Sequence, residues 1–231
     1  MPFLSASIPD NSWLRALSSA TRTAIQDAAK IRRFEVGAVI QALGAKPTGV
    51  FIIVEGAAQA SISNAEGNSF LLRILRVGDV LSEMPTDDEP AMLEVIARNS
   101  LTALWLSWDM FRSLRSRYPD LHHHSSVALG RRYVAALRVI EELGLMSVDD
   151  RILVRLGRMA EELEGAAALE HPTVLDITQA ELAAMTAAAR QTTNKALSSL
   201  STEGLIELRF KEIVVTPELV ACARRRAANC V

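Results

Sequence analysis

The sequence predicts an α+β fold in which a roll of short β-strands, a long helix and a small domain of helices and a β-hairpin follow one another. Three patterns support this prediction: glycine-punctuated apolar runs from residue 34 to 106, one unbroken helical repeat after Pro119, and a helix, turn, helix and hairpin after residue 173. Because 49% of the 231 residues are hydrophobic, the chain can bury a sizeable core. The expected domain limits are 1–120, 121–146 and 147–231.

The first domain is expected to begin with a helical segment from residue 10 to 30, capped by Asp10 or Asn11. After it, "VFIIVEGAAQASIS", "NAEGN" and "FLLRILRVGDV" predict a strand, a hairpin turn and a strand, and "VIARNSLTALWL" predicts two more strands. Short strands separated by about 8–12 residues are typical of an all-β roll or barrel. Ser107 can then cap a short helix that continues to Arg115.

A long helix is expected from about Leu121 to Leu143, with Gly144 at its end. Along it, residues recur in alternating steps of three and four, the a and d rhythm of a helix–helix seam. This dimer seam consists of Ser126, Leu129, Tyr133, Ala136, Ile140 and Leu143. A second stripe, expected to cover the roll, consists of Val127, Val134 and Leu137. A helix that is apolar on two faces needs two partners, and we expect the second to be the same helix of another copy. A helix hairpin within one chain is the alternative.

The C-terminal domain is predicted to be a winged helix-turn-helix. Thr178 and Glu181 have the spacing of a capping box, which begins a helix that buries Leu182 and Met185. A second helix follows almost at once and ends at Gly204. Its expected inward positions are Thr193, Ala196, Leu197 and Leu200. Because "LIELRFKEIVVTP" then predicts a hairpin, all the elements of a winged helix-turn-helix are present.

In that fold the second helix enters the major groove of DNA with its N-terminal residues on base edges. Here "AAARQTTNKAL" exposes Arg, Gln, Asn and Lys side chains, which bind base edges and phosphates. Residues 176–231 carry seven basic and six acidic side chains, a net charge of +1 beside −2 for the chain, so attraction to phosphate depends on local placement. The candidate DNA-binding residues are Thr178, Gln179, Arg190, Gln191, Thr192, Asn194, Lys195 and Ser198. A winged helix used for protein contacts is the alternative.

Over nearly the whole chain this arrangement resembles the CRP/FNR family of bacterial transcription factors. The resemblance is carried by "GVFIIVEGAAQASIS…LLRILRVGDVLSE", "SLRSRYPD", the long helix and "TQAELAAMTAAARQTTNKALSSLSTEGLIEL". It implies a cyclic-nucleotide-binding-like jelly roll that serves as a sensor, a dimerisation helix and a DNA-binding winged helix. The implied partners are double-stranded DNA, a second copy of the chain and RNA polymerase.

The turn and the recognition helix depart from the family pattern. The family usually has Gly at the position of Ala187 and often Ser at that of Ala189. An alanine at positive φ costs about 1–2 kcal/mol, so a turn built differently is the alternative. After Arg190 many relatives carry Glu where this chain has Gln191, so its DNA half-site is expected to differ from theirs.

The sensor pocket departs further. Relatives that bind cyclic nucleotides hold the phosphate with a Gly-Glu pair and a later Arg-Ser pair, where this chain has Ser82-Glu83 and Ala91-Met92. A buried phosphate without its Arg would be an unpaired charge, and the acidic residues 87–89 would repel it. We therefore expect no binding of cAMP. The candidate pocket residues are Ser82, Glu83, Met84, Ala91, Met92, Tyr133, Ala136 and Leu137.

No cofactor or metal is expected. Cys222 and Cys230 are too few for the four thiolates of an iron–sulfur cluster. His122, His123 and His124 point in three directions on one helix, so a single copy cannot hold a haem or a metal ion with all three. Two such histidine clusters across a dimer are the alternative.

The N-terminal "MPFLSASIPDNS" has no basic region or long apolar run, so no secretion signal or membrane span is expected, and the location is expected to be cytoplasmic. The chain shows no clustered nucleophile and base and no phosphate loop, so we do not expect an enzyme. The expected function is a homodimeric transcription regulator on a palindromic DNA operator. Its roll would sense an apolar effector or serve as a constitutive scaffold. A CRP-like scaffold that acts through protein partners is the alternative.

Overall fold

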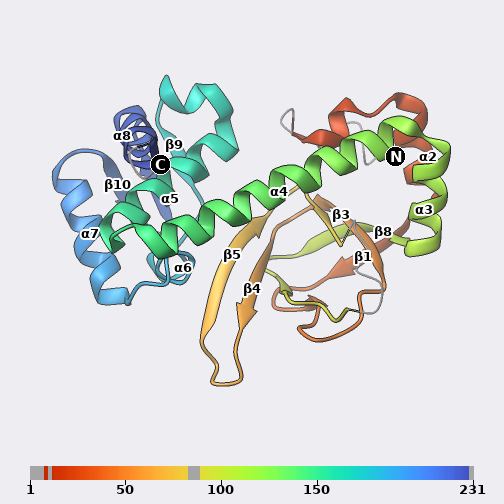
Figure 1. The fold of residues 1–231 in the computed structure, drawn as a ribbon, viewed down its shortest axis with the longest axis horizontal. Coiled ribbons are helices and arrows are strands. Elements are labelled where there is room, and N and C mark those ends of the chain that lie inside the picture. Colours follow the sequence, from red (N-terminus) through yellow and green to blue (C-terminus); the bar gives the residue numbers. More distant parts are fainter. Residues whose placement is uncertain (1–7, 10–11, 83–88, 229–231) are drawn as a thin grey trace. The chain divides into compact units, whose positions relative to one another are not determined.

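The computed structural model describes residues 8–9, 12–82 and 89–228 (Figure 1). The chain forms two compact units, residues 1–134 and 135–231, and helix α4 (Pro119–Leu145) has residues in both. The predicted α+β fold, with β-sheets, a long helix and a helix-turn-helix in that order, is confirmed. Within the described ranges, no helix is both long and apolar enough to span a lipid bilayer.

The first unit contains a β-roll made of two four-stranded antiparallel sheets, as predicted. One sheet has the strand order β1-β8-β3-β6 and the other β2-β7-β4-β5. The strands are β1 (Lys30–Phe34), β2 (Val39–Gln41), β3 (Gly49–Glu55), β4 (Ala58–Ser63), β5 (Ser69–Leu75), β6 (Val80–Leu81), β7 (Glu94–Ala97) and β8 (Leu101–Ser107).

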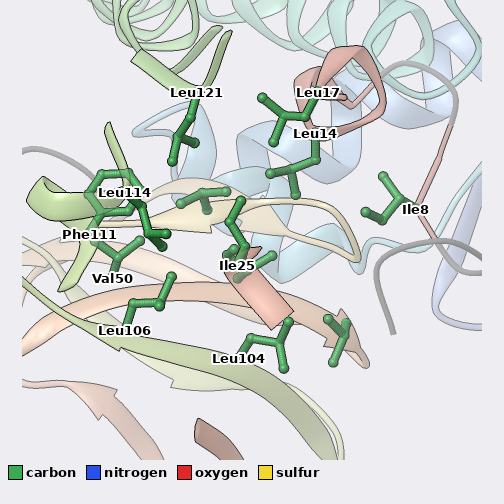
Figure 2. Close-up of a cluster of buried hydrophobic side chains, with 13 residues drawn as sticks. Ile8, Leu14, Leu17, Ile25, Val50, Leu104, Leu106, Phe111, Leu114 and Leu121 are labelled. Carbon is green, nitrogen blue, oxygen red and sulfur yellow. The ribbon is translucent and has the colours of Figure 1, made fainter. Parts of the chain in front are cut away.

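Strand β3 supplies side chains to two separate cores. Because side chains alternate along a strand, Val50, Ile52 and Val54 face one way while Phe51 and Ile53 face the other. The first group packs against the flanking helices (Figure 2). The members of that cluster from the helices are Leu14, Ile25, Phe111, Leu114 and Leu121, and Leu17 follows directly after η1. The second group joins residues from both sheets to fill the inside of the roll.

The flanking helices differ from the prediction at the N-terminus. Their bounds are η1 (Trp13–Ala16), α2 (Ser19–Ala28) and α3 (Trp108–Arg117). The helical segment expected from residue 10 to 30 is divided in two, because Ser12 caps η1 and Ser18 caps α2. Asp10 and Asn11, the expected caps, lie outside the described residues. Ser107 caps α3 as predicted.

Helix α4 meets the roll along a stripe that the sequence did not predict. Leu121, Ser125 and Ala128 are buried, and the Arg132 Nη2 atom donates to the carbonyl oxygen of Val80 at 2.6 Å. The prediction of the roll-covering stripe is wrong, because its three members are exposed: Val127, Val134 and Leu137. At about 100° of rotation per residue, that stripe lies on the opposite side of the helix.

Asp120 joins the first turn of α4 to the first turn of α2. Its carboxylate accepts hydrogen bonds from the Ser18 backbone N–H at 2.8 Å and from the buried Thr21 hydroxyl at 2.7 Å. Burial opposes ionisation of this carboxyl group, but these hydrogen bonds and one from the Leu121 backbone outweigh it and lower the pKa to about 2. The charged form therefore stabilises the junction of the two helices.

The second unit carries the helix-turn-helix. Its elements are the end of α4, α5 (Val148–Glu164), η2 (Gly165–Leu169), β9 (Thr173–Leu175), α6 (Gln179–Met185), α7 (Arg190–Thr202), β10 (Ile206–Arg209), β11 (Glu212–Val215) and α8 (Pro217–Ala228). The strands form one antiparallel sheet in the order β10-β11-β9. Helices α5 and α8 approach closely at Gly157, where a Cβ atom would collide with that of Ala223.

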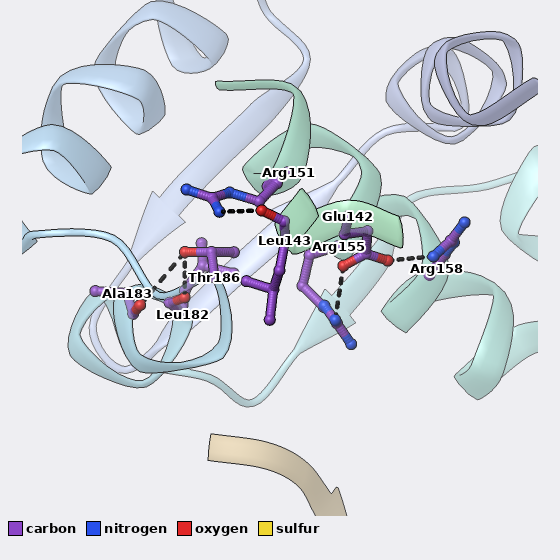
Figure 3. Close-up of polar contacts among 8 residues, drawn as sticks. All are labelled: Glu142, Leu143, Arg151, Arg155, Arg158, Leu182, Ala183 and Thr186. Carbon is purple, nitrogen blue, oxygen red and sulfur yellow. Dashed lines mark hydrogen bonds and ion pairs between the residues drawn. The ribbon is translucent and has the colours of Figure 1, made fainter. Parts of the chain in front are cut away.

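A buried ion cluster holds the last turns of α4 to α5 (Figure 3). The Glu142 side chain is only 3% exposed; it accepts a hydrogen bond from Arg155 Nη2 at 2.7 Å and another from Arg158 Nη1. The Arg151 guanidinium donates to the Leu143 carbonyl oxygen at 3.5 Å. A buried carboxylate needs such partners, because leaving its charge unpaired in the interior would be strongly destabilising.

Replacing Asp120 with Asn is expected to lower the free energy of unfolding at neutral pH by about 1–2 kcal/mol, because a carboxylate accepts stronger hydrogen bonds than an amide. The folded-state pKa of about 2 lies below the ordinary value of 3.8, so this stabilisation is present above pH 4 and is lost as the pH falls toward 2. Urea unfolding at a series of pH values should therefore show that the difference in free energy of unfolding between the native and variant proteins disappears as the pH falls over that range.

Asp109→Asn is the matched control, because the Asp109 side chain is 90% exposed. It should show no comparable gap. The role of Asp120 would be contradicted if the native and Asp120→Asn proteins had the same free energy of unfolding, or if the difference between them did not depend on pH.

Candidate nucleic-acid interface and effector region

The start of α6 is built as the sequence predicts. The Thr178 hydroxyl accepts a hydrogen bond from the Glu181 backbone N–H at 3.1 Å, and the Glu181 carboxylate accepts one from the Thr178 backbone N–H at 2.8 Å. The capping box is therefore confirmed. Because the Thr178 hydroxyl also donates to Glu181 at 2.9 Å, its polar groups are engaged within the helix start, whereas the Gln179 side chain is exposed.

The turn between α6 and α7 places an alanine in the left-handed region. Ala187 has φ +49°, the conformation that favours glycine. The turn is stabilised around it, because the buried Thr186 hydroxyl donates to the Leu182 carbonyl oxygen at 2.9 Å and the Ala188 N–H donates to the Ala183 carbonyl oxygen at 3.0 Å. Ala187 thus has the positive φ that was the expected cost of an alanine at this position.

Helix α7 has one buried face and one exposed polar face. The predicted inward residues are confirmed as buried: Thr193, Ala196, Leu197 and Leu200. The predicted DNA-binding residues of α7 are all exposed: Arg190, Gln191, Thr192, Asn194, Lys195 and Ser198. Among the described residues, no side chain bonds to the side chains of Arg190, Gln191, Asn194 and Lys195 through a hydrogen bond or ion pair. Ala189, at the N-cap, offers no side-chain hydrogen bond to the helix, so the first backbone N–H groups of α7 are also free of a side-chain cap.

The hairpin of β10 and β11 adds residues that the sequence analysis did not single out. Phe210 and Lys211 occupy its two-residue turn, and Phe210 is exposed. The Arg209 guanidinium donates two hydrogen bonds to the Glu207 carboxylate, at 2.8 and 3.0 Å. The signal available in the sequence was an aromatic residue between the charged residues of "RFKE", at a position where turn residues are usually small or polar.

The effector region has its polar groups bonded to each other. Ser82, with φ +56°, donates from Oγ to Gln41 Oε1 at 2.6 Å, and Gln41 Nε2 donates to the Leu93 carbonyl oxygen at 3.1 Å. Ala91 is buried, and its backbone N–H donates to the Ala45 carbonyl oxygen at 2.9 Å. Hence the Ser82 hydroxyl and the Ala91 N–H already have partners within the protein.

The other candidate pocket residues that the structure describes are exposed. Met92 is 76% exposed and adds no charge, and Tyr133, Ala136 and Leu137 are exposed on α4. Glu83 and Met84 lie outside the described residues. Positions 91 and 92, which are Ala and Met, offer neither a guanidinium nor a hydroxyl group to a phosphate.

The dimer seam is exposed along α4 in the single chain. Tyr133 and Ile140 are each 66% exposed, and Leu129 and Leu143 are 37% and 38% exposed. Ser126 and Ala136, the remaining members, are exposed as well. The seam is thus available to a partner, and its pairing stays a prediction.

The three histidines near the start of α4 do not converge. His122 Nδ1 lies 3.1 Å from Arg115 Nη2, and the rings of His123 and His124 meet edge to face. In the part of the chain that the structure describes, no three or more His, Cys, Asp or Glu side chains group as metal ligands would.

Two family models match the chain, one in each unit. The cyclic nucleotide-binding domain matches residues 31–118, and the Crp-like helix-turn-helix domain matches residues 150–218. Similar curated proteins include the cAMP-activated global transcriptional regulator CRP of Pasteurella multocida, which is 27% identical over 176 residues that make up 74% of this chain and 83% of that protein. The regulator of the same description from Escherichia coli O157:H7 is also 27% identical, over 74% of this chain and 82% of its own length.

Solved structures show the same fold. A CooA mutant from Carboxydothermus hydrogenoformans superposes with a TM-score of 0.77 at 18% identity, over 95% of this chain and 97% of that one. The c-di-GMP responsive regulator CLP of Xanthomonas campestris gives a TM-score of 0.71 at 18% identity, over 86% of this chain and 99% of its own.

Replacing Ala187 with Gly is expected to raise the free energy of unfolding by about 0.5–1 kcal/mol. The reason is that the left-handed conformation costs an alanine about 1–2 kcal/mol, more than glycine loses through its greater backbone freedom when unfolded. Chemical denaturation measures the difference. The matched control is Ala184→Gly in α6, which should lower the free energy of unfolding by about 1 kcal/mol. If Ala187→Gly lowered the free energy of unfolding as Ala184→Gly does, the positive φ of Ala187 would be contradicted.

Proposed function

Because this chain belongs to the CRP/FNR family of transcription regulators, we propose that it acts as a homodimer that binds a palindromic DNA operator through α7. The family consists of DNA-binding regulators with a helix-turn-helix and not of enzymes. The proposal concerns the finer points: which residues contact DNA, what the operator looks like, and what the roll responds to.

The exposed polar face of α7 carries this proposal. A helix whose opposite face is buried can present Arg190, Gln191, Asn194 and Lys195 to a major groove without disturbing the core. Arg190 can donate two hydrogen bonds to guanine, and the Gln191 amide can pair with adenine N6 and N7. The uncapped backbone N–H groups at the start of α7 favour a phosphate at the same place, because they carry the positive end of the helix dipole.

A two-fold symmetric dimer implies a palindromic operator. A two-fold pair of chains presents two copies of α7 related by the same axis, so the bound DNA sequence should be its own inverted repeat. The exposed seam on α4 is the apolar surface that supports this pairing. RNA polymerase is the further partner proposed, because a regulator bound at a promoter acts on that enzyme.

The proposed regulation departs from that of the cAMP-activated relatives. The Ser82 hydroxyl already donates to Gln41, and positions 91 and 92 lack the Arg and Ser that would bind a cyclic phosphate. We propose that cAMP is not the effector, and that the roll responds to an apolar molecule or serves as a constitutive scaffold. No cofactor or metal is proposed for the protein.

Gln191→Ala is expected to weaken binding to the duplex that the purified protein selects from a random pool by about 1–3 kcal/mol, and to relax the preference at one base pair in each half-site. Lys195→Ala should reduce affinity evenly across sequences, with a shallower salt dependence, if Lys195 contacts only phosphate. Selection followed by fluorescence anisotropy measures both effects. Thr202→Ala, at the other end of α7, is the matched control and should bind as the native protein does.

A folded Gln191→Ala protein that bound every duplex as well as the native protein would show that α7 does not contact base edges. The alternative, a CRP-like scaffold that acts through protein partners, would then be favoured.

cAMP and cGMP are expected to bind no more tightly than millimolar. The reason is that a buried phosphate would have no guanidinium partner at positions 91 and 92. Isothermal titration calorimetry is the measurement, with the cAMP-activated regulator of Escherichia coli as the positive control. A micromolar dissociation constant for this chain would contradict the proposed regulation.

A further inference from the structure

The last turns of α4 are held to the rest of the second unit by a charged side chain. Residues 135–145 of this helix belong to that unit, and the structure describes all of them. Among these residues Glu142 alone is buried, while apolar neighbours such as Ile140 and Leu143 are exposed. Helices that pack together ordinarily bury an apolar stripe. The buried contact of this helix end is made by a carboxylate instead.

The two oxygen atoms of the Glu142 carboxylate are held by two different side chains of α5 (Figure 3). Arg155 Nη2 donates to Oε2 at 2.7 Å, and Arg158 Nη1 donates to Oε1. The two arginines are three residues apart and therefore lie on one face of α5. Because each carboxylate oxygen has its own donor, a rotation or a shift of α4 against α5 would break at least one of these hydrogen bonds.

Stability alone does not account for this Glu142 cluster, which consists of Glu142, Arg155 and Arg158. Replacing a buried ion cluster with apolar side chains of similar size often leaves a protein equally stable or more stable, because the charges lose their hydration on burial. Apolar contacts have no preferred direction, whereas hydrogen bonds do. What the cluster adds over an apolar contact is therefore a defined angle between α4 and α5.

The connection between the two helices passes that angle on to the recognition helix. Two residues, Met146 and Ser147, lie between the end of α4 and the start of α5. Ser147 caps α5, because its Oγ atom accepts a hydrogen bond from the Asp150 backbone N–H at 3.2 Å. Helix α5 in turn packs against α7. A change of the backbone torsions at these two residues would turn α5 and α7 relative to the end of α4, and the Glu142 cluster opposes such a change.

The same segment of α4 carries part of the predicted dimer seam. Ala136, Ile140 and Leu143 lie within residues 135–145. Two residues of an α-helix turn through about 200°, so Glu142 faces roughly away from Ile140. One side of the segment is thus available for pairing, while another is bonded to α5. In a two-fold dimer the angle between α4 and α5 then determines how far apart the two copies of α7 are.

We propose that Glu142, Arg155 and Arg158 are positioning residues that set which spacing of the two half-sites the dimer accepts. They do not contact DNA and act through α5 on the separation and orientation of the two α7 helices. This inference rests on the proposed function, because it requires a dimer that places both copies of α7 on one duplex. Successive base pairs are displaced by about 3.4 Å and rotated by about 35°, so a fixed pair of helices should fit one spacing.

The test measures binding to duplexes that differ in half-site spacing, using fluorescence anisotropy. The duplexes are the palindrome that the native protein selects from a random pool, the same palindrome with two base pairs inserted or removed at its centre, and a duplex with one half-site. The native protein should bind the altered spacings at least about tenfold more weakly than the selected one, because the second α7 then meets the wrong base edges.

The decisive variant replaces the cluster with apolar side chains: Glu142→Leu, Arg155→Met and Arg158→Leu together. It should fold and keep the mass of a dimer in sedimentation, but bind the three spacings within about threefold of one another, because apolar contacts allow a range of angles. Glu142→Gln, which removes only the charge, is the second variant and should reduce the spacing preference in the same direction. The matched control is Glu161→Leu with Arg224→Met, because that ion pair joins α5 to α8. It should keep the native spacing preference.

The outcomes separate this inference from the proposed function. If the apolar variant is a folded dimer with the native spacing preference, the inference is overturned while the dimer and the role of α7 stand. If the native protein binds all three spacings alike, the inference is also overturned. If it binds no duplex, or binds the palindrome no better than the single half-site, the proposed dimeric function is overturned as well. If neither variant of the cluster folds, the cluster is a determinant of folding and the inference is overturned.

Discussion

Helix α4 has more apolar surface than the β-roll covers, and the proposed assembly depends on this excess. Leu121, Ser125 and Ala128 are buried on one side of the helix, while Tyr133 and Ile140 are left 66% exposed on another. Burial of such an apolar stripe away from water is favourable, and a second copy of the chain has a matching stripe to pack against it. In the proposed dimer the same helix therefore serves two purposes: one face packs within the first unit, and another pairs the chains so that two copies of α7 can bind one palindrome.

Backbone strain coincides with the candidate functional sites. Among the described residues other than glycine, Ser82, Ala187 and Lys211 have positive φ. Ser82 lies in the effector region, Ala187 in the turn before α7, and Lys211 at the tip of the hairpin. Such conformations persist where surrounding contacts hold them in place. Here Ser82 is held by its hydrogen bond to Gln41, and the turn at Ala187 by the hydrogen bond from the buried Thr186 hydroxyl.

The helix-turn-helix could be predicted from the sequence because its determinants are local. The spacing of Thr178 and Glu181 defines the start of α6, and the 3.6-residue period gives the buried face of α7. The side of α4 that faces the roll could not be predicted, because Ser125 and Arg132 are polar and only tertiary neighbours decide that they point inward. The exposure of Phe210 could not be predicted for a related reason: it is known only once the register of the β10–β11 hairpin is known.

Sedimentation equilibrium of the native protein and of Ile140→Asp tests the pairing along α4 most directly. The native protein should have twice the 25.2 kDa mass of one chain at micromolar concentration. Ile140→Asp should sediment as a single chain or unfold, because the substitution buries a charge in the seam. Val127→Asp, on the exposed side away from the seam, should keep the doubled mass. A native mass of 25.2 kDa, or an Ile140→Asp protein that is well folded and still has the doubled mass, would contradict the account.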